Sequence, residues 1–159
     1  MSAACDHDRL RPGLHGRSLA AELEAAETRC TEGDQRLTAP RRRVLQLLLQ
    51  AGQPVKAYDL ISSYGESGEP AKPPTVYRAL DFLEKHGFVH RIESLNAFVA
   101  CRAGDATHAA AFLICDCCGR SEEVSPMEAG PLLKAAETSG YVLTAITMEG
   151  HGLCGACRA

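Results

Sequence analysis

Two pairs of cysteines near the end of the chain constrain its fold more than any other feature. Cys115 and Cys118 form one Cys-x-x-Cys pair, Cys154 and Cys157 form a second, and 35 residues separate the pairs. A structural zinc ion takes four soft ligands in a tetrahedron, and a two-residue spacer lets a single turn supply two of its corners. The spacing therefore predicts a closed four-thiolate zinc site that joins two distant turns.

The segment that carries these pairs is small for a domain that folds on a hydrophobic core alone. Strands are predicted at 110–115 and 121–124, and residues 141–148 form a third β-rich run. Residues 125–128 have the pattern of a capping box that opens a helix. An α/β unit of about 55 residues usually needs a bound metal, a partner copy or both. We therefore predict a metal-binding dimerisation domain over residues 109–159.

The composition excludes some classes of protein. Apolar residues make up 45% of the chain, enough for a packed core, and no apolar run is long enough to span a membrane. The first residues lack the apolar stretch with basic flanks that marks a secretory signal. Eight cysteines in such a chain point to reduced thiols and metal binding rather than to disulfides. We therefore expect a cytoplasmic protein.

Charge is distributed unevenly along the chain. The net charge is -3, yet residues 36–91 alone carry +4, whereas residues 1–35 and 92–159 are acidic. A basic segment within an acidic chain is typical of a module that contacts phosphates, although so modest an excess also fits a solvated surface. Residues 1–17 lack apolar periodicity and are predicted to form a mobile tail.

The basic segment has the element order of a winged helix-turn-helix. Apolar periodicity predicts four helices, at about 18–32, 38–51, 57–64 and 73–86. Ser18 is expected to cap the start of the first helix. Two short strands follow, at 88–92 and 97–101. Three helices closed by a small hairpin form such a fold, whose last helix enters the major groove of DNA. We predict this domain over residues 18–101, giving an α+β protein; a generic helical bundle with a stray hairpin fits the order and charge less well.

The second and fourth helices carry the clearest apolar stripes. The inward face of the fourth helix is predicted to be Val76, Ala79, Leu80 and Leu83. The buried stripe of the second helix is predicted to be Val44, Leu47, Leu48 and Ala51. Gly87 is expected to end the fourth helix in a left-handed conformation. Tyr77 and Arg78 are left on its outer side.

A second set of potential metal ligands spans the predicted domain boundary. It consists of His90 and Cys101 on the two hairpin strands, His108 in the connector and Glu123 on the strand beyond. Mixed nitrogen, sulfur and oxygen ligands suit zinc better than magnesium or calcium. A metal held from both domains would fix the angle between them across a hinge at 102–108, as a sensor requires. Taken singly, a strand histidine is more often a surface residue, and a buried cysteine more often belongs to the core.

Several motifs resemble those of the ferric uptake regulator family. They are Arg36-Leu-Thr-Ala-Pro-Arg-Arg42, the stretch from Ala71 to His90 that contains Thr75-Val-Tyr-Arg78, Phe112-Leu-Ile-Cys-Asp-Cys-Cys-Gly119 and His151-Gly-Leu-Cys-Gly-Ala-Cys157. The resemblance spans residues 18–158 and looks greatest to the zinc uptake regulators of that family. It implies a homodimeric, zinc-dependent transcriptional repressor. One or two dimers would bind an A·T-rich palindromic operator and switch off zinc-uptake genes.

The resemblance also implies roles for individual residues. A structural zinc would be held by Cys115, Cys118, Cys154 and Cys157, and a regulatory zinc by His90, Cys101, His108 and Glu123. Each subunit would therefore bind two Zn²⁺ ions. Tyr58 and Arg78 would contact DNA bases. The other DNA-binding residues would be Thr75 and Lys72 and, near the DNA backbone, Tyr77, Arg41, Arg42 and Arg43.

Other functions fit parts of the pattern. A peroxide or redox sensor of the same family would use Cys115, Cys118 and Cys117, the thiol that the spacing leaves spare, and a further alternative is a sensor of another metal. Iron-sensing members have a histidine-rich stretch where Thr107-His-Ala-Ala-Ala111 holds one histidine, which together with Cys101 favours zinc. An enzyme is not expected, because the chain has no His-x-Glu or His-Glu-x-x-His pattern and a four-thiolate zinc leaves no open position for water.

Overall fold

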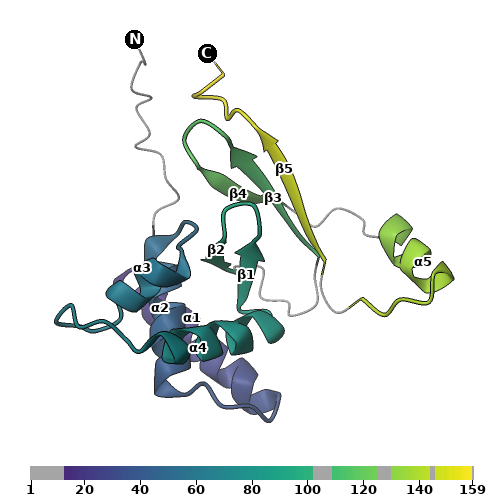
Figure 1. The fold of residues 1–159 in the computed structure, drawn as a ribbon. Helices are drawn as coiled ribbons and strands as arrows, with labels where there is room; N and C mark the ends of the chain where they lie inside the picture. The colour runs from purple at the N-terminus through teal and green to yellow at the C-terminus, as the bar shows by residue number, and fades with distance from the viewer. Residues whose placement is uncertain (1–12, 102–108, 125–129, 144–145, 159) are drawn as a thin grey trace. The chain divides into compact units, whose positions relative to one another are not determined.

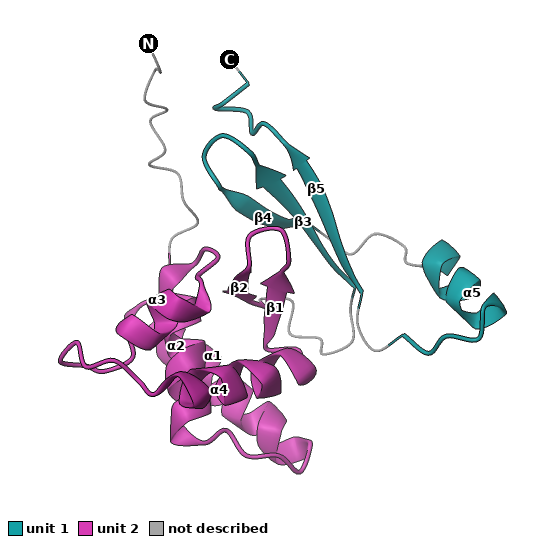
Figure 2. Ribbon diagram, viewed as in Figure 1, with its two compact units in different colours: residues 1–8, 107–159 teal, residues 9–106 magenta. Residues whose placement is uncertain are grey.

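The computed structural model describes residues 13–101, 109–124, 130–143 and 146–158. The chain divides into two compact units (Figure 2), which we call the winged-helix unit (residues 9–106) and the C-terminal unit (residues 107–159, grouped with residues 1–8). Helices and strands occur in both units, which confirms the predicted α+β class. Among the described residues, no helix combines the length and the apolar character needed to cross a membrane.

The described residues of the winged-helix unit form four helices followed by a β-hairpin (Figure 1). Its elements are α1 (Gly16–Glu32), α2 (Ala39–Ala51), α3 (Ala57–Ser62), α4 (Pro73–Lys85), β1 (Val89–Ile92) and β2 (Ala97–Ala100). β1 and β2 pair antiparallel, with Val89 opposite Ala100 and Ile92 opposite Ala97. Val55 exchanges two backbone hydrogen bonds of 2.8 Å with Phe98, so the hairpin is anchored to the segment between α2 and α3. The predicted winged helix-turn-helix is confirmed.

The ends of α2 and α4 follow from local chemistry. Each helix has proline in its first turn, where a backbone N–H has no partner within the helix. The α2 helix ends at Gly52 with φ 63°, and the residue after the cap of α4 is Gly87 with φ 69°. Glycine adopts these left-handed angles without steric cost. The expected terminating role of Gly87 is therefore confirmed.

The core lies where α2 and α4 pack together. The predicted stripe of α4 is buried as expected, and Phe82 joins it. The predicted stripe of α2 is partly wrong: the buried residues are Val44, Leu45, Leu48 and Leu49, whereas Leu47 and Ala51 are only half-buried. The α2 helix contacts α1, α4 and β2, not a single partner helix. Its buried face is therefore wider than one stripe and is centred on Leu45 and Leu48.

Two helix ends differ from the sequence prediction. α1 begins at Gly16, with His15 as its cap, not at Ser18. The Leu14 N–H donates to the Leu49 carbonyl at 2.9 Å and the Leu14 side chain packs on the core, so this part of the expected tail belongs to the folded unit. Residues 1–12 lie outside the described residues. α3 ends at Ser62, two residues before the predicted end at Tyr64.

Within the C-terminal unit, the described residues form a small sheet and one helix. Its elements are β3 (Ala110–Cys115), β4 (Ser121–Val124), α5 (Gly130–Thr138) and β5 (Thr147–Gly152). β3 is the central strand; β4 pairs with it antiparallel and β5 pairs with it parallel (Figure 1). The buried residues of the described part of this unit all lie on β3, and they are Ala110, Ala111, Phe112, Ile114 and Cys115. The predicted capping box at 125–128 lies outside the described residues.

The prediction for the last strand is partly wrong, because the expected β-rich run at 141–148 shares only Thr147 and Met148 with β5 (Thr147–Gly152). Tyr141 and Val142, which belong to the expected β-rich run, are outside any strand and are 70% and 91% exposed. The strand begins only at Thr147 and continues through two glycines. Hydrogen bonding to β3 determines where this strand lies in the sequence. At Gly150 the two strands are close: a Cβ atom there would lie 3.2 Å from Leu113 Cδ2, so a side chain would crowd β3.

Candidate metal centre and nucleic-acid interface

The structure brings the four predicted thiols together. Cys115 ends β3, and Cys118 lies in the turn that follows; Cys154 and Cys157 come after β5. The parallel pairing places Cys115 opposite Gly152, so both cysteine pairs leave the sheet at the same end. The four sulfur atoms lie within 4.8 Å of one another.

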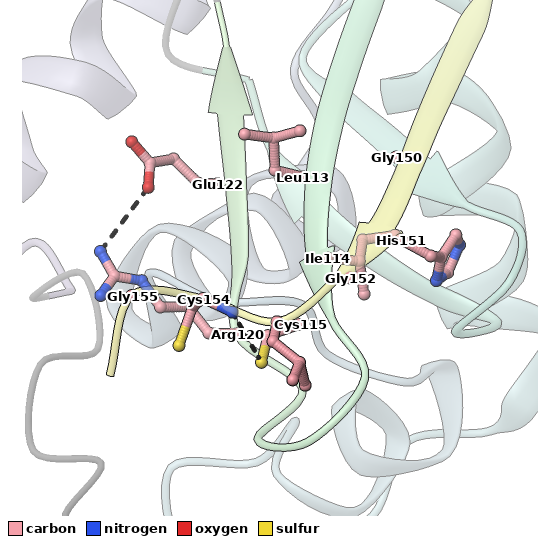
Figure 3. A pocket seen from close by; sticks show the side chains of 11 residues that line it. Leu113, Ile114, Cys115, Arg120, Glu122, Gly150, His151, Gly152, Cys154 and Gly155 are labelled. Carbon is pink, nitrogen blue, oxygen red and sulfur yellow. Dashed lines mark hydrogen bonds and ion pairs between the residues drawn. The ribbon is translucent and has the colours of Figure 1, made fainter. Parts of the chain in front are cut away.

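Short turns orient the thiols. The Gly119 N–H donates to the Cys115 carbonyl at 2.8 Å, and Gly119 has φ 71°, which only glycine adopts readily. The Cys157 N–H donates to the Cys154 carbonyl at 2.9 Å. Between the two turns, the Cys154 N–H donates to Cys115 Sγ at 3.3 Å (Figure 3). Backbone geometry therefore holds the two cysteine pairs together.

Without a metal, the surroundings of the cluster favour deprotonation of one thiol, Cys115, and oppose deprotonation of Cys118 and Cys157. The backbone N–H groups of Cys154, Cys118 and Cys117 lower the pKa of Cys115 to about 6. The pKa of Cys118 is raised: the Arg120 N–H lowers it, but desolvation and the neighbouring thiols outweigh that effect. Desolvation and the other thiols also raise the pKa of Cys157. Four thiolates can gather here only around a cation, which compensates their mutual repulsion.

The sulfur geometry fits a tetrahedral cation. With a metal–sulfur distance of about 2.3 Å, as for zinc, the edge of a four-sulfur tetrahedron is about 3.8 Å. Cys118 Sγ and Cys154 Sγ lie 3.9 Å apart. Cys117 is exposed and lies outside the four-thiol group. The four-thiol cluster can therefore bind a thiophilic metal such as zinc, with every tetrahedral position filled by sulfur.

A histidine next to the cluster, His151, contacts two carboxylates. His151 Nδ1 lies 3.1 Å from Asp116 Oδ1, and His151 Nε2 lies 3.4 Å from Glu149 Oε2. The hydrogen bond to Asp116, and then the one to Glu149, raises the pKa of His151. His151 also lines a pocket of about 440 Å³ beside the thiols (Figure 3). The contact between His151 and Asp116 links β5 to the first cysteine turn.

Two of the four predicted mixed ligands lie together within the winged-helix unit. His90 on β1 is opposite Val99, and the Cys101 N–H donates to the Phe88 carbonyl at 2.9 Å. His90 and Cys101 are therefore diagonal neighbours on one face of the hairpin. Their ligand atoms lie within 4.8 Å of each other, and both residues are half-buried. Glu123 is a half-buried residue of β4 in the C-terminal unit, and His108 lies outside the described residues.

Several predicted DNA-binding residues are exposed on the helix-turn-helix. Tyr58 on α3 is 75% exposed and Tyr77 on α4 is 50% exposed. Arg78 on α4 and Lys72 at its cap are also exposed, whereas Thr75 is half-buried in the first turn. The outer surface of α4 therefore offers hydroxyl, guanidinium and ammonium groups together.

The three consecutive arginines of α2 all have partners inside their own unit. Arg41 donates to the Arg36 carbonyl at 2.6 Å, and its guanidinium carbon lies 3.5 Å from the centre of the Phe82 ring. Arg42 Nη1 lies 4.0 Å from a Glu27 carboxylate oxygen; the Arg42 side chain is partly exposed and that of Glu27 is exposed. Arg43 Nε donates to the Tyr64 carbonyl at 2.6 Å. No local sequence signal indicates these contacts, because their partners are distant along the chain or are backbone carbonyls.

Comparisons with known proteins agree with the motifs. The model of the ferric uptake regulator family matches residues 32–151. The zinc uptake regulation protein of Escherichia coli (strain K12) is 42% identical over 137 residues, which cover 85% of this chain and 80% of that protein. The ferric uptake regulation protein of Legionella pneumophila is 31% identical over 127 residues, covering 77% of this chain and 91% of that protein.

Solved structures give the same result. A zinc uptake regulator complexed with zinc and DNA matches with a TM-score of 0.80 and 40% identity, covering 90% of this chain and 97% of that one. The crystal structure of holo XcZur matches with a TM-score of 0.76 and 46% identity, covering 87% and 97%. The family match covers most of the chain, and the fold and the thiol cluster agree with it. This chain belongs to the ferric uptake regulator family.

Proposed function

We propose that this chain is a zinc-responsive transcriptional repressor. Its zinc-loaded homodimer would bind an A·T-rich palindromic operator, as one or two dimers, and repress zinc-uptake genes. The observation that carries the proposal is the four-thiol cluster in a member of this family. Similarity to a zinc uptake regulation protein, and to a zinc uptake regulator solved with zinc and DNA, supports the choice of metal and partner.

We assign the structural zinc to Cys115, Cys118, Cys154 and Cys157. When bound, the ion supplies the positive charge that lets four thiolates share one site. The backbone of Cys154 already holds Cys115 as a hydrogen-bond acceptor, which reduces the reorganisation needed for binding. The C-terminal unit has a small described core, so this site would contribute much of its folding free energy.

We assign a second, regulatory zinc to His90, Cys101, His108 and Glu123, which makes two ions per subunit. The closeness of His90 and Cys101 on the hairpin supports this assignment. Residues 18–101 would form the DNA-binding domain and residues 109–159 the dimerisation domain, joined by a hinge at 102–108. Ligands drawn from both domains would stabilise one hinge angle. By linkage, whatever factor zinc adds to DNA affinity, DNA adds to zinc affinity.

The dimer is supported by exposed apolar side chains in the C-terminal unit. No residue of α5, which is described in full, is buried, and Leu132 on this helix is 50% exposed. The exposed residues Tyr141, Val142 and Leu143 follow it closely. Apolar surface of this kind is typical of a region covered by another chain. A second copy would bury it and enlarge the small core.

We propose that α4 enters the major groove. Arg78 would form a bidentate contact with a guanine edge, and Tyr58 would pack on a thymine methyl group. Their exposure supports these roles. The remaining residues proposed to contact DNA directly are Thr75, Lys72, Tyr77 and Arg42. Arg41 and Arg43, which the family motif also places near the DNA backbone, are held by internal contacts and would take part indirectly. Of the three arginines, Arg42 has the weakest internal contact and could turn most easily toward a phosphate.

We propose no catalytic activity, because the family and the relatives named above are regulators and the four-thiol site has no open position for water. A cytoplasmic location would follow from access to operator DNA and from reduced cysteines. None of the described cysteines forms a disulfide, which agrees with that location.

The test measures zinc per chain and DNA binding together. Purified protein would be analysed before and after mild chelation, with a duplex that the zinc-loaded protein itself selects from random DNA. We expect two zinc ions to fall to one as DNA binding is lost. One zinc throughout, with DNA binding indifferent to the chelator, would overturn the proposal. Release of DNA by peroxide instead of by chelator would identify a redox sensor.

A further inference from the structure

Arg43 joins α2 to the end of α3. Its Nε donates to the Tyr64 carbonyl at 2.6 Å, and a terminal guanidinium nitrogen donates to the Ser63 carbonyl at 3.4 Å. Ser63 is the C-cap of α3, and Tyr64 packs partly buried against the core. The guanidinium fork thus contacts two successive carbonyls where the helix ends, a position at which the helix dipole favours a cation.

α3 needs such an anchor because it is short. All six of its residues are described, and Leu60 alone among them is fully buried. A helix of this length has little stability of its own, so tertiary contacts determine its orientation. Arg43 provides the side-chain hydrogen bonds at its C-terminal end, to the Ser63 and Tyr64 carbonyls. The Ala71 N–H also donates to the Ile61 carbonyl at 2.9 Å, and the Ile61 side chain packs against the core. The same helix carries Tyr58, the most exposed of the predicted DNA-contacting tyrosines.

We propose that Arg43 is a positioning residue for DNA recognition. It holds the C-terminal end of α3 against α2 and thereby sets the direction of Tyr58, while its own charge stays on the two carbonyls instead of on a phosphate. This inference rests on the proposed DNA-binding function, and it gives Arg43 a different role from that of Arg42. Arg42, one residue earlier, has only a weak surface ion pair with Glu27 at 4.0 Å. The two adjacent arginines therefore have different roles.

Lysine distinguishes the two roles. It keeps the positive charge but lacks the planar fork that contacts two carbonyls at once. If Arg43 contacted a phosphate, Arg43→Lys would bind DNA nearly as well as the wild type. If Arg43 positions α3, Arg43→Lys should behave like Arg43→Gln. Arg42→Gln is the matched control, since it removes a charge from the same helix without touching α3.

The first measurement needs no DNA. Hydrogen–deuterium exchange of the full zinc-loaded chain would report the protection of the α3 amides. We expect Arg43→Lys and Arg43→Gln to lower that protection about tenfold, with Arg42→Gln and the α4 amides unchanged. Unchanged α3 exchange in both Arg43 variants would overturn the proposal whatever the chain binds.

The second measurement uses the duplex selected by the wild type and a scrambled duplex of equal length, titrated over a range of salt. We expect Arg43→Lys to lose about tenfold in affinity for the selected duplex only, with an unchanged salt slope. Arg42→Gln should weaken both duplexes equally and reduce the slope by about 0.9. Wild-type affinity for Arg43→Lys would overturn the positioning role. If the wild-type chain binds no duplex, the proposed function fails and the exchange result still decides the role of Arg43 in placing α3.

Discussion

Replacement of Cys154 by serine should unfold the C-terminal unit and leave the winged-helix unit folded. Cys154 offers both a sulfur atom 3.9 Å from Cys118 Sγ and the N–H that donates to Cys115 Sγ. The substitution keeps the N–H but removes one of four thiolates. Hydroxyl oxygen is a poor substitute for a thiolate at zinc, so the metal affinity should fall steeply.

The size of the effect follows from the small core of this unit. Phe112 and Ile114 are the large side chains buried in its described part, and each contributes about 1.5–3 kcal/mol. Structural zinc in small four-ligand sites contributes an apparent free energy of about 10–16 kcal/mol near neutral pH. Half of the zinc contribution, about 5–8 kcal/mol, is comparable to or larger than the roughly 3–6 kcal/mol that the two side chains supply. The fold of β3, β4 and β5 should therefore depend on the metal.

The assay is hydrogen–deuterium exchange on the full chain, with zinc content measured on the same samples. Amides of β3 and β5 should exchange rapidly in Cys154→Ser, while those of α2 and α4 stay protected by their own buried core. Cys117→Ser is the control, because this thiol is exposed and outside the four-thiol group. It should keep wild-type zinc content and protection.

Equal protection of β3 and β5 in Cys154→Ser and Cys117→Ser, at equal zinc content, would refute the reasoning. It would mean that three thiolates suffice, or that the sheet folds without metal. Loss of zinc without loss of protection would refute the energetic part alone. The thiol cluster would then bind zinc without stabilising the sheet.

Three further predictions concern a proposed zinc ligand, a proposed DNA-contacting residue and His86 at the end of α4. Cys101→Ser should remain a folded dimer but lose zinc-dependent DNA binding, as fluorescence anisotropy across a zinc titration would show; an unchanged titration would contradict the ligand assignment. Arg78→Ala should cost about 1–3 kcal/mol at one base position of the selected duplex and relax specificity there, measured against base-substituted duplexes. Burial, and then the charges of Lys85 and Arg41, lower the pKa of His86 from 6.5, so the unfolded chain binds its proton more readily than the folded chain. The free energy of unfolding should therefore fall as the pH drops through 6.5 and level off below the folded pKa, and denaturant titrations of His86→Gln should lack this component.

The helices and the wing were predictable because their signals are local. The apolar stripe of α4 recurs at helical spacing, and Gly87 supplies the left-handed residue that follows its end. The thiol cluster was predictable for a similar reason, since each Cys-x-x-Cys pair lies within one turn. Only the approach of the two turns needed tertiary structure, and the spacing of the pairs already suggested it.

The last strand was not predictable from its own residues. Tyr141 and Val142 have high strand propensity but remain exposed, whereas Gly150 and Gly152 have low propensity and lie in β5. Pairing with β3 provides the hydrogen bonds, and the close approach of Leu113 favours glycine at position 150. Tertiary pairing therefore outweighed local preference, as it often does at the edge of a small sheet.

The different contacts of the three α2 arginines could not be predicted from the sequence. A run of three guanidinium groups in a basic segment predicts contact with phosphates, and net charge gives no means of separating its members. The fold separates them by direction: Arg41 stacks on Phe82, Arg42 points to a surface carboxylate and Arg43 binds the end of α3. Successive helical residues are about 100° apart, so three neighbours meet three different environments. Arg41 and Arg43 are thus held by internal contacts, whereas Arg42 has only a weak ion pair. Under the proposed function, substitutions only one residue apart should therefore change DNA affinity and DNA specificity differently.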